Sequence, residues 1–331
     1  MIKQPTGVGV LADTQRRHVL YLGPRPLTQM IQEEVGPSYE VFWTPADSAV
    51  VATRLAAASV WLDASMKIPL DDKLLSQAPN LELVITATTG SDHINRSLLE
   101  ARGIPLMTMQ GETHFLRELT PAAELSWLLL LACARRLRAA LHHVEAGGWD
   151  RELFPGQMLN GKTLGIIGCG RIGSWMARYG GAFGMTVLGY DPFLPTLPAA
   201  ISPRSLDDLL SESDFVSVHV PFNETTRGLL AARELALMRN GAVLINTSRG
   251  AVVNEDALIE SMEAGRPAAL GVDVLEGEPD IQNSKLWKYA RHHENVLITP
   301  HIGGFSPDAL ERVLRFTAGR VREYFRARAA S

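Results

Sequence analysis

Three residues whose side chains suit acid-base and carboxylate chemistry follow separate apolar runs in the second half of the chain. Arg249 stands in "INTSRGAVVNEDAL", Glu278 in "LGVDVLEGEPD" and His301 in "NVLITPHIGG". An arginine holds a carboxylate through two parallel hydrogen bonds. A histidine exchanges a proton near neutral pH, and a neighbouring glutamate orients the imidazole. Each residue alone has an ordinary structural explanation, but together they suit the oxidation of a hydroxyl group beside a carboxylate.

A glycine motif precedes these residues in "LGIIGCGRIG", where Gly168, Gly170 and Gly173 have G-x-G-x-x-G spacing. Such a motif is informative only when it follows a strand, opens a helix and meets an acidic residue about 20 residues later. Here "KTLGIIG" predicts the strand, "RIGSWMARYGGAFG" predicts the helix, and Asp191 ends the next β-like run. The context therefore predicts a dinucleotide site, with the pyrophosphate at the N-terminus of the helix.

Asp191 indicates which dinucleotide is bound. Its carboxylate would accept hydrogen bonds from the adenosine ribose hydroxyls and would repel a 2′-phosphate, so NAD is favoured over NADP. The alternative is an ordinary turn residue before Pro192.

The elements that must position these residues alternate between short apolar runs and amphipathic stretches, which predicts parallel sheets covered by helices. In the first part of the chain we expect strands at 18–23, 39–43, 59–63, 81–87 and 104–109. In the second part we expect six strands, at 163–168, 186–191, 215–220, 242–248, 268–274 and 295–300. Between the two series, Thr120 as N-cap and Pro121 in the first turn predict one long helix that runs to about Gly147.

Composition excludes several classes of protein. The 331 residues are 46% hydrophobic and 21% charged, and the net charge of −4 does not indicate binding to nucleic acid or to an anionic membrane. The apolar run "ELSWLLLLACA" is shorter than the ~20 residues that span a bilayer. The N-terminal segment has no signal-peptide core, and we expect its first dozen or so residues to be a loose tail. The two cysteines belong to no metal-ligand cluster, so we expect no metal and a cytoplasmic protein.

The chain resembles the D-isomer-specific 2-hydroxyacid dehydrogenase family, which includes glyoxylate/hydroxypyruvate reductases and D-3-phosphoglycerate dehydrogenases. The matching stretches are "GKTLGIIGCGRIG", "YDP", "SDFVSVHVPFNETTRGLL", "LINTSRGAVVNEDAL", "GVDVLEGEP" and "NVLITPHIGG", with "TTGSDHIN" in the first part. The resemblance implies two doubly wound parallel-sheet domains, with a Rossmann-type NAD domain at 118–303 inserted into a flavodoxin-like substrate domain at 1–117 and 304–331. It also implies a homodimer formed through the long helix of the nucleotide domain.

The resemblance also implies roles for residues at matching positions. Arg249 would bind the carboxylate of a small 2-keto or 2-hydroxy acid and polarise its carbonyl, and His301, paired with Glu278, would be the acid/base. Backbone N–H groups of Thr89, Gly90 and Ser91 would bind the same carboxylate. Further contacts to NAD would come from Thr89, Arg171, Ile172, Val220, Thr247, Ser248, Asp273 and Gly304, with Asp273 on the nicotinamide amide.

Two departures from the family pattern are visible. The chain ends soon after its last predicted helix, without the serine-sensing tail of some phosphoglycerate dehydrogenases. The stretch "GETHFLRELT" is several residues longer than in most relatives, and we expect it to close over the far end of the substrate, with Arg117 meeting a polar or anionic group. The alternative is that Phe115 and Leu116 staple the start of the long helix.

Two other functions are compatible with parts of this sequence. Formate dehydrogenase is a relative, but its Asn-containing and Gln-containing stretches are replaced here by "GETHFL" and "GEP". An NAD(H)-sensing corepressor of the same fold could retain the Arg, Glu and His residues, and turnover of keto acids would separate the two functions.

Overall fold

The computed structural model describes residues 16–330, which form two compact units. The first unit contains the chain up to Glu112 and again from Pro307, and the second unit is Thr113–Ser306. The boundaries expected from the sequence, 117/118 and 303/304, lie a few residues away. The N-terminal tail expected from the sequence lies outside the described residues.

The first unit is built on a parallel sheet of five strands in the order β2-β1-β3-β4-β5. This is the flavodoxin-like order of a doubly wound sheet, as expected. The strands are β1 (Arg17–Leu22), β2 (Tyr39–Trp43), β3 (Val60–Asp63), β4 (Leu83–Thr86) and β5 (Leu106–Met107).

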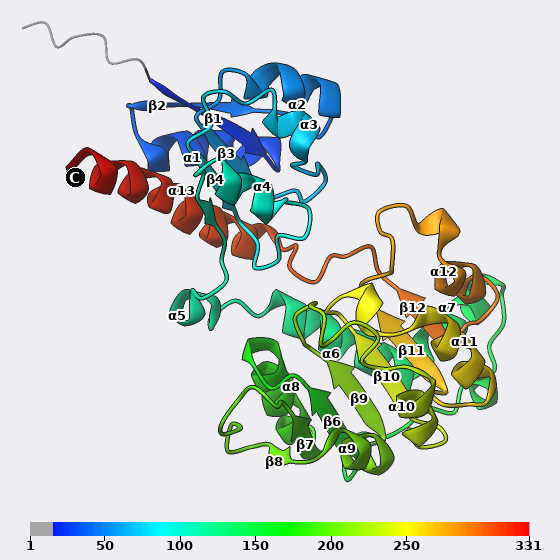
Figure 1. Ribbon diagram of the computed structural model, residues 1–331. Coiled ribbons are helices and arrows are strands. Elements are labelled where there is room, and N and C mark those ends of the chain that lie inside the picture. The colour runs from blue at the N-terminus through cyan, green and yellow to red at the C-terminus, as the bar shows by residue number, and fades with distance from the viewer. Residues whose placement is uncertain (1–15, 331) are drawn as a thin grey trace, which may run out of the picture. The chain divides into compact units, whose positions relative to one another are not determined.

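Helices cover both faces of this sheet (Figure 1). They are α1 (Thr28–Val35), α2 (Ser48–Leu55), α3 (Asp72–Leu75), α4 (Arg96–Ala101) and the C-terminal α13 (Pro307–Ala330), which packs on α1. Side chains at the N-caps of α2, α3 and α4 accept hydrogen bonds from backbone N–H groups of the first turn, which fixes where these helices begin. One core of the unit contains Leu20 and Leu22 of β1, Val51 of α2 and Trp61 of β3.

The second unit has a parallel sheet of seven strands in the order β12-β11-β10-β9-β6-β7-β8. Numbered along the chain, the strands β6 to β11 have the order 3-2-1-4-5-6 that is typical of dinucleotide-binding domains, and β12 adds a seventh strand beside β11. The strands are β6 (Thr163–Ile167), β7 (Thr186–Tyr190), β8 (Ser202–Pro203), β9 (Phe215–Val218), β10 (Val243–Asn246), β11 (Ala269–Val272) and β12 (Val296–Ile298). The sequence predicted all of these except β8, an exposed pair of residues.

Each strand of this sheet sends alternate side chains to opposite faces. On one face Ile166 and Ile245 pack with α6 (Pro121–Ala134) and α8 (Arg171–Ala182). On the other face Ile167 and Leu244 pack with the remaining helices. These are α9 (Leu206–Glu212), α10 (Ala232–Leu237), α11 (Glu255–Glu263) and α12 (Lys285–Ala290). A sheet buried on both faces explains why its strands are continuous apolar runs rather than alternating ones.

The expected single long helix is two helices, which corrects the prediction from the sequence. α6 ends at Ala134, and α7 (Leu137–Glu145) begins after Arg136, whose φ of 51° is left-handed. α6 is apolar nearly all round and therefore buried, whereas the following "RRLR" stretch cannot enter the core. Arg138 instead donates hydrogen bonds to the carbonyls of Ala290 and Val296 at 3.0 and 2.6 Å. The glycine stop after α7 is confirmed, because Gly147 has a φ of 83°.

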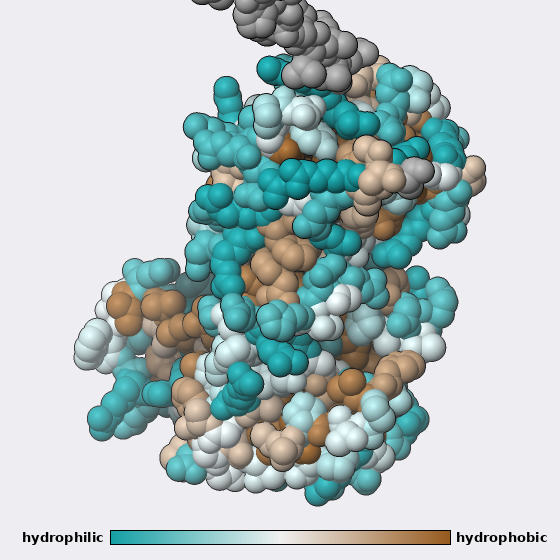
Figure 2. Space-filling model, turned by 90° about the vertical axis from the view of Figure 1, so that its left-hand side faces the viewer, coloured by the Kyte–Doolittle hydropathy of each residue, from teal (hydrophilic) through white to brown (hydrophobic). Residues whose placement is uncertain are grey.

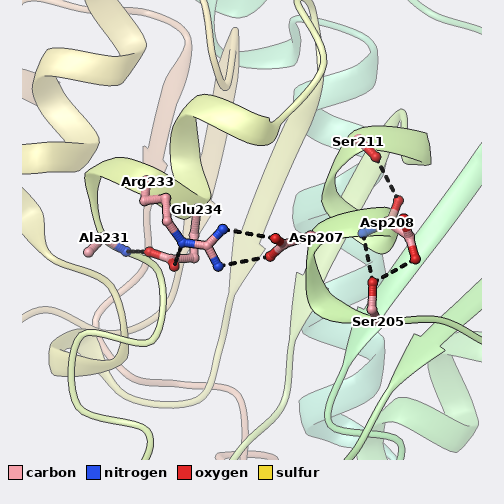
Figure 3. A network of polar contacts seen from close by, with 7 residues as sticks. All are labelled: Ser205, Asp207, Asp208, Ser211, Ala231, Arg233 and Glu234. Atoms are coloured by element: carbon pink, nitrogen blue, oxygen red, sulfur yellow. Dashed lines mark hydrogen bonds and ion pairs between the residues drawn. The ribbon is translucent and has the colours of Figure 1, made fainter.

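A polar network on the surface joins α9 to α10 (Figure 3). Both Nη atoms of Arg233 contact the carboxylate of Asp207, at 2.8 and 3.0 Å, and its Nε donates to Glu234 at 3.0 Å. The hydrogen bonds from Arg233 to Asp207 lower the pKa of Asp207. Ser205 caps α9 by accepting from the backbone N–H of Asp208 at 3.1 Å. The network sets the spacing of the two helices but adds little stability, since its charges are solvated.

The remaining surface is mixed. Figure 2 shows groups of apolar residues among polar ones on one face. No helix in the described part of the chain has the length and apolarity needed to cross a membrane. Cys133 and Cys169 are both free and buried, and the cytoplasmic location stays a prediction.

Candidate functional site

The glycine turn after β6 has the backbone that the motif predicted. Gly168 has a φ of 88°, and a Cβ there would lie 2.6 Å from the carbonyl oxygen of His219. A Cβ on Gly173 would lie 2.2 Å from the carbonyl oxygen of Gly168, so this glycine lets α8 approach the turn. Gly170 precedes α8 and has open space around it. The turn therefore presents the N-terminus of a twelve-residue helix to solvent, which suits a pyrophosphate.

Asp191 follows β7 and faces the same turn. Its Oδ2 accepts a hydrogen bond from the backbone N–H of Cys169 at 3.0 Å, and its Oδ1 accepts from that of Phe193 at 3.0 Å. The residue lines a cavity of about 460 Å³ whose wall runs from Gly189 to Arg204 and includes several apolar side chains. These are Leu194, Pro195, Leu197, Pro198 and Ile201. An apolar pocket with a carboxylate at its edge fits an adenosine group.

Arg171 supplies a positive charge beside the turn. Its Nη1 donates to the carbonyl oxygen of Leu119 at 2.7 Å, and burial lowers its pKa. Among the described residues it has no acidic partner, so a bound anion would compensate the charge. Burial and the nearby Arg171 also lower the pKa of His219 to about 3, and this imidazole lies 2.7 Å from the Oγ of Ser217. The charge, the helix terminus and the cavity together fit a dinucleotide.

The turn after β10 carries Arg249 and is organised by Asn246, which the sequence prediction missed. The buried Asn246 side chain accepts hydrogen bonds from the backbone N–H and the hydroxyl of Ser248, at 3.0 and 2.7 Å. It also donates to the carbonyl oxygen of Arg249 at 3.0 Å. An asparagine at the end of an apolar strand is a signal for such a side-chain turn. Arg249 itself is extended, and its Nη1 donates to the carbonyl oxygen of Ser248 at 2.8 Å.

His301 and Glu278 form the pair that the sequence predicted. The Nδ1 of His301 lies 2.6 Å from Oε1 of Glu278, and the imidazole side chain is 36% exposed. The Oε2 of Glu278 accepts from the backbone N–H of Leu275 at 3.4 Å. His301 has a left-handed φ of 53°. Its Nε2 has no hydrogen-bond partner among the described residues, so one nitrogen is oriented and the other is available to a reacting group.

Asp273 is tied to the loop that carries His301. It is almost fully buried, and it accepts hydrogen bonds from the backbone N–H groups of Ile302 and Gly303 at 2.9 and 2.7 Å. The hydroxyl of Thr299 also donates to it, at 2.5 Å. The hydrogen bonds of this carboxylate therefore fix the 299–303 loop. Its contact with a nicotinamide amide stays a prediction.

Other residues expected at the cofactor lie around the same sheet edge. A Cβ on Gly168 would be 3.0 Å from Cγ1 of Val220. The Oγ1 of Thr247 is 2.7 Å from the Oγ of Ser126 on α6. Ile172 is half-buried on α8, and Gly304 is exposed with open space around it.

The residues expected to bind a carboxylate from the first part of the chain follow β4 in the first unit. Thr89, Gly90 and Ser91 form part of a loop in which the hydroxyl of Thr88 donates to the carbonyl oxygen of Gly90 at 2.7 Å. The backbone N–H groups of all three residues have no acceptor among the described residues. Three consecutive free N–H groups form a surface suited to an anion.

The long stretch 111–120 forms the short helix α5 (Thr113–Leu116) and a turn. Leu116 and Leu119 are buried and Phe115 is half-buried, so the apolar residues do pack. Helix α8 holds the turn, because Nε1 of Trp175 donates to the carbonyl oxygen of Arg117 at 3.1 Å. The side chain of Arg117 is exposed.

Thr120 does not cap α6 with its hydroxyl, contrary to the prediction. Its backbone is already helical, and its hydroxyl donates to the carboxylate of Glu124 in the first turn of α6. Pro121 does occupy the first turn.

Comparisons with known proteins agree with this geometry. Residues 127–303 match the model of the D-isomer specific 2-hydroxyacid dehydrogenase NAD binding domain. Glyoxylate reductase of Thermococcus litoralis is 39% identical over 75% of this chain and 75% of its own length. D-3-phosphoglycerate dehydrogenase of Mycobacterium leprae is 34% identical over 89% of this chain, which spans only 55% of that protein.

The solved structures show the same fold. D-lactate dehydrogenase of Aquifex aeolicus, complexed with NAD and lactic acid, superposes with a TM-score of 0.78 at 31% identity, covering 94% of this chain and 96% of the other. The matched NAD domain, the relative covered over three quarters of both chains and the nearly complete superposition settle the family, the oxidoreductase class and the cofactor. The chain belongs to the D-isomer specific 2-hydroxyacid dehydrogenase family, and its cofactor is NAD.

Proposed function

We propose that the protein reduces a small 2-keto acid to the D-2-hydroxy acid and catalyses the reverse oxidation. The observation that carries the proposal is the 2.6 Å contact between Nδ1 of His301 and Glu278, with Nε2 left available. Arg249 follows another strand of the same parallel sheet. Family relatives named as glyoxylate reductase and hydroxypyruvate reductase act on small keto acids, which supports this substrate class.

The acid/base step belongs to His301. In reduction, its Nε2 gives a proton to the carbonyl oxygen at C2, which becomes the hydroxyl group. In oxidation, the same nitrogen takes the hydroxyl proton. Glu278 holds the ring through Nδ1 and stabilises the imidazolium, so that the proton is carried on the nitrogen that meets the substrate.

Arg249 binds the carboxylate of the substrate and draws electron density from the neighbouring carbonyl. A guanidinium suits both tasks, because its planar fork contacts a carboxylate with two N–H groups. In the first unit, the free backbone N–H groups of Thr89, Gly90 and Ser91 are proposed to bind the same carboxylate.

Bound NAD(H) supplies or accepts the hydride at C2. The chain would hold the pyrophosphate with the glycine turn and Arg171, and the ribose hydroxyls with Asp191. The remaining contacts are assigned to Thr89, Ile172, Val220, Thr247, Ser248, Asp273 and Gly304.

We also propose that the protein is a homodimer through the second unit. α7 has no buried residue, and its apolar side chains follow a helical stripe at Leu137, Leu141 and Val144. In the segment after α7, the side chain of Trp149 is almost completely exposed and that of Met158 is largely exposed. Exposed apolar side chains that gather in one stretch of the chain are typical of an interface between subunits.

The decisive experiment replaces His301 by Asn and measures the oxidation of NADH with a panel of 2-keto acids. Loss of the general acid should lower kcat/KM about 10²- to 10⁴-fold. His293→Asn is the matched control, because that imidazole also faces a glutamate, Glu263, at 3.7 Å but precedes β12, whereas His301 follows that strand.

Turnover by His301→Asn close to that of the unmodified protein would overturn the assignment. The same panel tests the reaction class, because a protein that only sensed NAD(H) would reduce none of these acids at an appreciable rate.

A further inference from the structure

A buried histidine-carboxylate pair lies in the first unit, outside the residues assigned above. The Nε2 of His93 is 2.8 Å from Oδ2 of Asp63, and the side chains are 8% and 0% exposed. Burying such a pair costs desolvation, and apolar residues of similar volume would often stabilise the fold as well. A pair of this kind therefore requires an explanation other than stability alone.

The position of the pair supplies one. Asp63 is the last residue of β3, and His93 lies in the loop that follows β4, so both stand at the carboxyl ends of neighbouring parallel strands. In doubly wound sheets ligands bind at this edge. His93 comes two positions after Ser91, within the loop 88–95 that is proposed to bind the substrate carboxylate. We call residues 88–95 the carboxylate loop.

Asp63 joins two segments through one carboxylate. Its Oδ1 accepts hydrogen bonds from the backbone N–H and the hydroxyl of Ser65, at 2.6 and 2.8 Å, and from the N–H of Met66 at 3.3 Å. Met66 has a left-handed φ of 56°, so this turn depends on its hydrogen bonds. The other oxygen, Oδ2, holds His93. The carboxylate loop is thereby fixed to the turn after β3.

Within the carboxylate loop, further contacts carry this constraint to Ser91. The N–H of Ile94 donates to the carbonyl oxygen of Ser91 at 2.9 Å, and the N–H of Leu70 donates to that of His93 at 2.9 Å. Nη2 of Arg96 donates to the Oγ of Ser91 at 2.7 Å. The segment with the free N–H groups of residues 89–91 is thus held at its Ser91 end.

We propose that Asp63 and His93 are positioning residues that keep the carboxylate loop in the conformation that binds the substrate carboxylate. The inference rests on the proposed function. Neither side chain touches the substrate. Their effect is to order the N–H groups in advance, so that binding does not have to immobilise a flexible loop.

The first test compares Asp63→Asn, His93→Gln and the double variant in steady-state kinetics with glyoxylate or a better keto acid. Asp63→Asn keeps the shape and removes the charge. KM for the keto acid should rise about 10-fold or more, since small displacements of positioning groups have large effects. KM for NADH should rise by a clearly smaller factor, because Thr89 is the one assigned cofactor residue in the carboxylate loop and the others lie in the second unit. The double variant should be no worse than the single ones, as expected for partners in one contact.

Two controls separate positioning from loss of stability. His18 and Glu40 form another histidine-carboxylate pair in the same unit, 3.8 Å apart and partly exposed, on β1 and β2. Glu40→Gln should leave KM for the keto acid unchanged. Val51→Ala removes a buried aliphatic group from the core of the unit and should lower Tm without raising that KM.

An activity-independent measurement completes the test. Hydrogen exchange of the hydrogen-bonded amides of Ile94 and Asn95 in the carboxylate loop should accelerate in Asp63→Asn by about 10-fold, while the first unit outside this loop and the turn at 63–66 keeps its protection. If the unmodified protein reduces no keto acid, the proposed function fails, and the exchange result still decides whether Asp63 orders the loop. Unchanged KM and unchanged exchange in both single variants would overturn the proposal. An equal rise in KM in a Val51→Ala protein of matched Tm would overturn it as well.

Discussion

Replacement of Asp191 by Ala is the most informative perturbation of the cofactor site, because this carboxylate has two separate tasks. It holds the backbone N–H of Cys169, between the two glycines of the turn, and that of Phe193 after β7, each at 3.0 Å. Each oxygen keeps a further lone pair, which the proposal assigns to the ribose hydroxyls. The variant should therefore weaken the binding of NADH and loosen the turn at the same time.

The expected magnitudes follow from these contacts. Hydrogen bonds to a charged group are worth about 1.5–3 kcal/mol, so KM for NADH should rise about 10- to 100-fold. NADPH also depends on the turn but gains from the loss of a like-charge contact with its 2′-phosphate, so its kcat/KM should fall less than that of NADH. The ratio of kcat/KM for NADH over NADPH should therefore fall. The unpaired N–H of Cys169 should lower the free energy of unfolding by about 1–3 kcal/mol.

The assay measures kcat/KM for both cofactors at a saturating keto acid, together with Tm. Asp214→Ala is the matched control, because Asp214 also holds a backbone N–H, that of Thr163 at 2.9 Å, but at the start of β6. It should lower Tm without changing the cofactor ratio. Equal use of NADH and NADPH by the unmodified protein would refute the reasoning, and so would an unchanged ratio in Asp191→Ala.

Three further predictions concern other parts of the molecule. Because burial and Arg171 lower the pKa of His219 to about 3, the folded state binds fewer protons than the unfolded state between that pH and about 6.5, so stability falls as pH falls. His219→Gln should remove up to about 1.4 kcal/mol per pH unit from this slope in urea unfolding at pH 5.5 and 4.5, and an unchanged slope would contradict the burial argument. Leu141→Glu combined with Val144→Glu should convert a dimer to a monomer in sedimentation analysis, whereas an unmodified protein that is monomeric at micromolar concentration would exclude the interface. Arg117→Ala should lower kcat/KM about 10- to 100-fold on the best long or acidic keto acid and spare glyoxylate, while a uniform loss with a lower Tm would indicate a packing role instead.

The strands and the glycine turn could be predicted from sequence because their signals are local. A strand buried on both faces must be a continuous apolar run, and only glycine tolerates the φ of Gly168 and the close approach at Gly173. The pairing of Glu278 with His301 was also predictable, but only by combining residues at the ends of different strands.

The features that were predicted wrongly or missed depend on contacts that the local sequence does not show. The break between α6 and α7 follows from the burial of one helix and the exposure of the next, while the local pattern is helical throughout. The strand β8 has only two paired residues, one of them Pro203, so its sequence carries no strand pattern. The hydroxyl of Thr120 donates to the carboxylate of Glu124, one turn later, instead of accepting a backbone N–H at the start of the helix.

The sequence alone does not reveal whether a polar residue at a strand end contacts a ligand or holds a loop, and the structure shows why. Asp63, Asp191, Asn246 and Asp273 each end or follow a parallel strand, and each accepts a hydrogen bond from a backbone N–H group of a loop at that edge of its sheet. A sequence pattern cannot separate a carboxylate that contacts a ligand from one that holds the loop that does so, since both belong at the same sheet edge. Protein donors occupy three acceptor positions of the Asp273 carboxylate but only two of that of Asp191. Strand-end acids in such sheets are therefore best assigned by counting how many of their acceptor positions the backbone already uses.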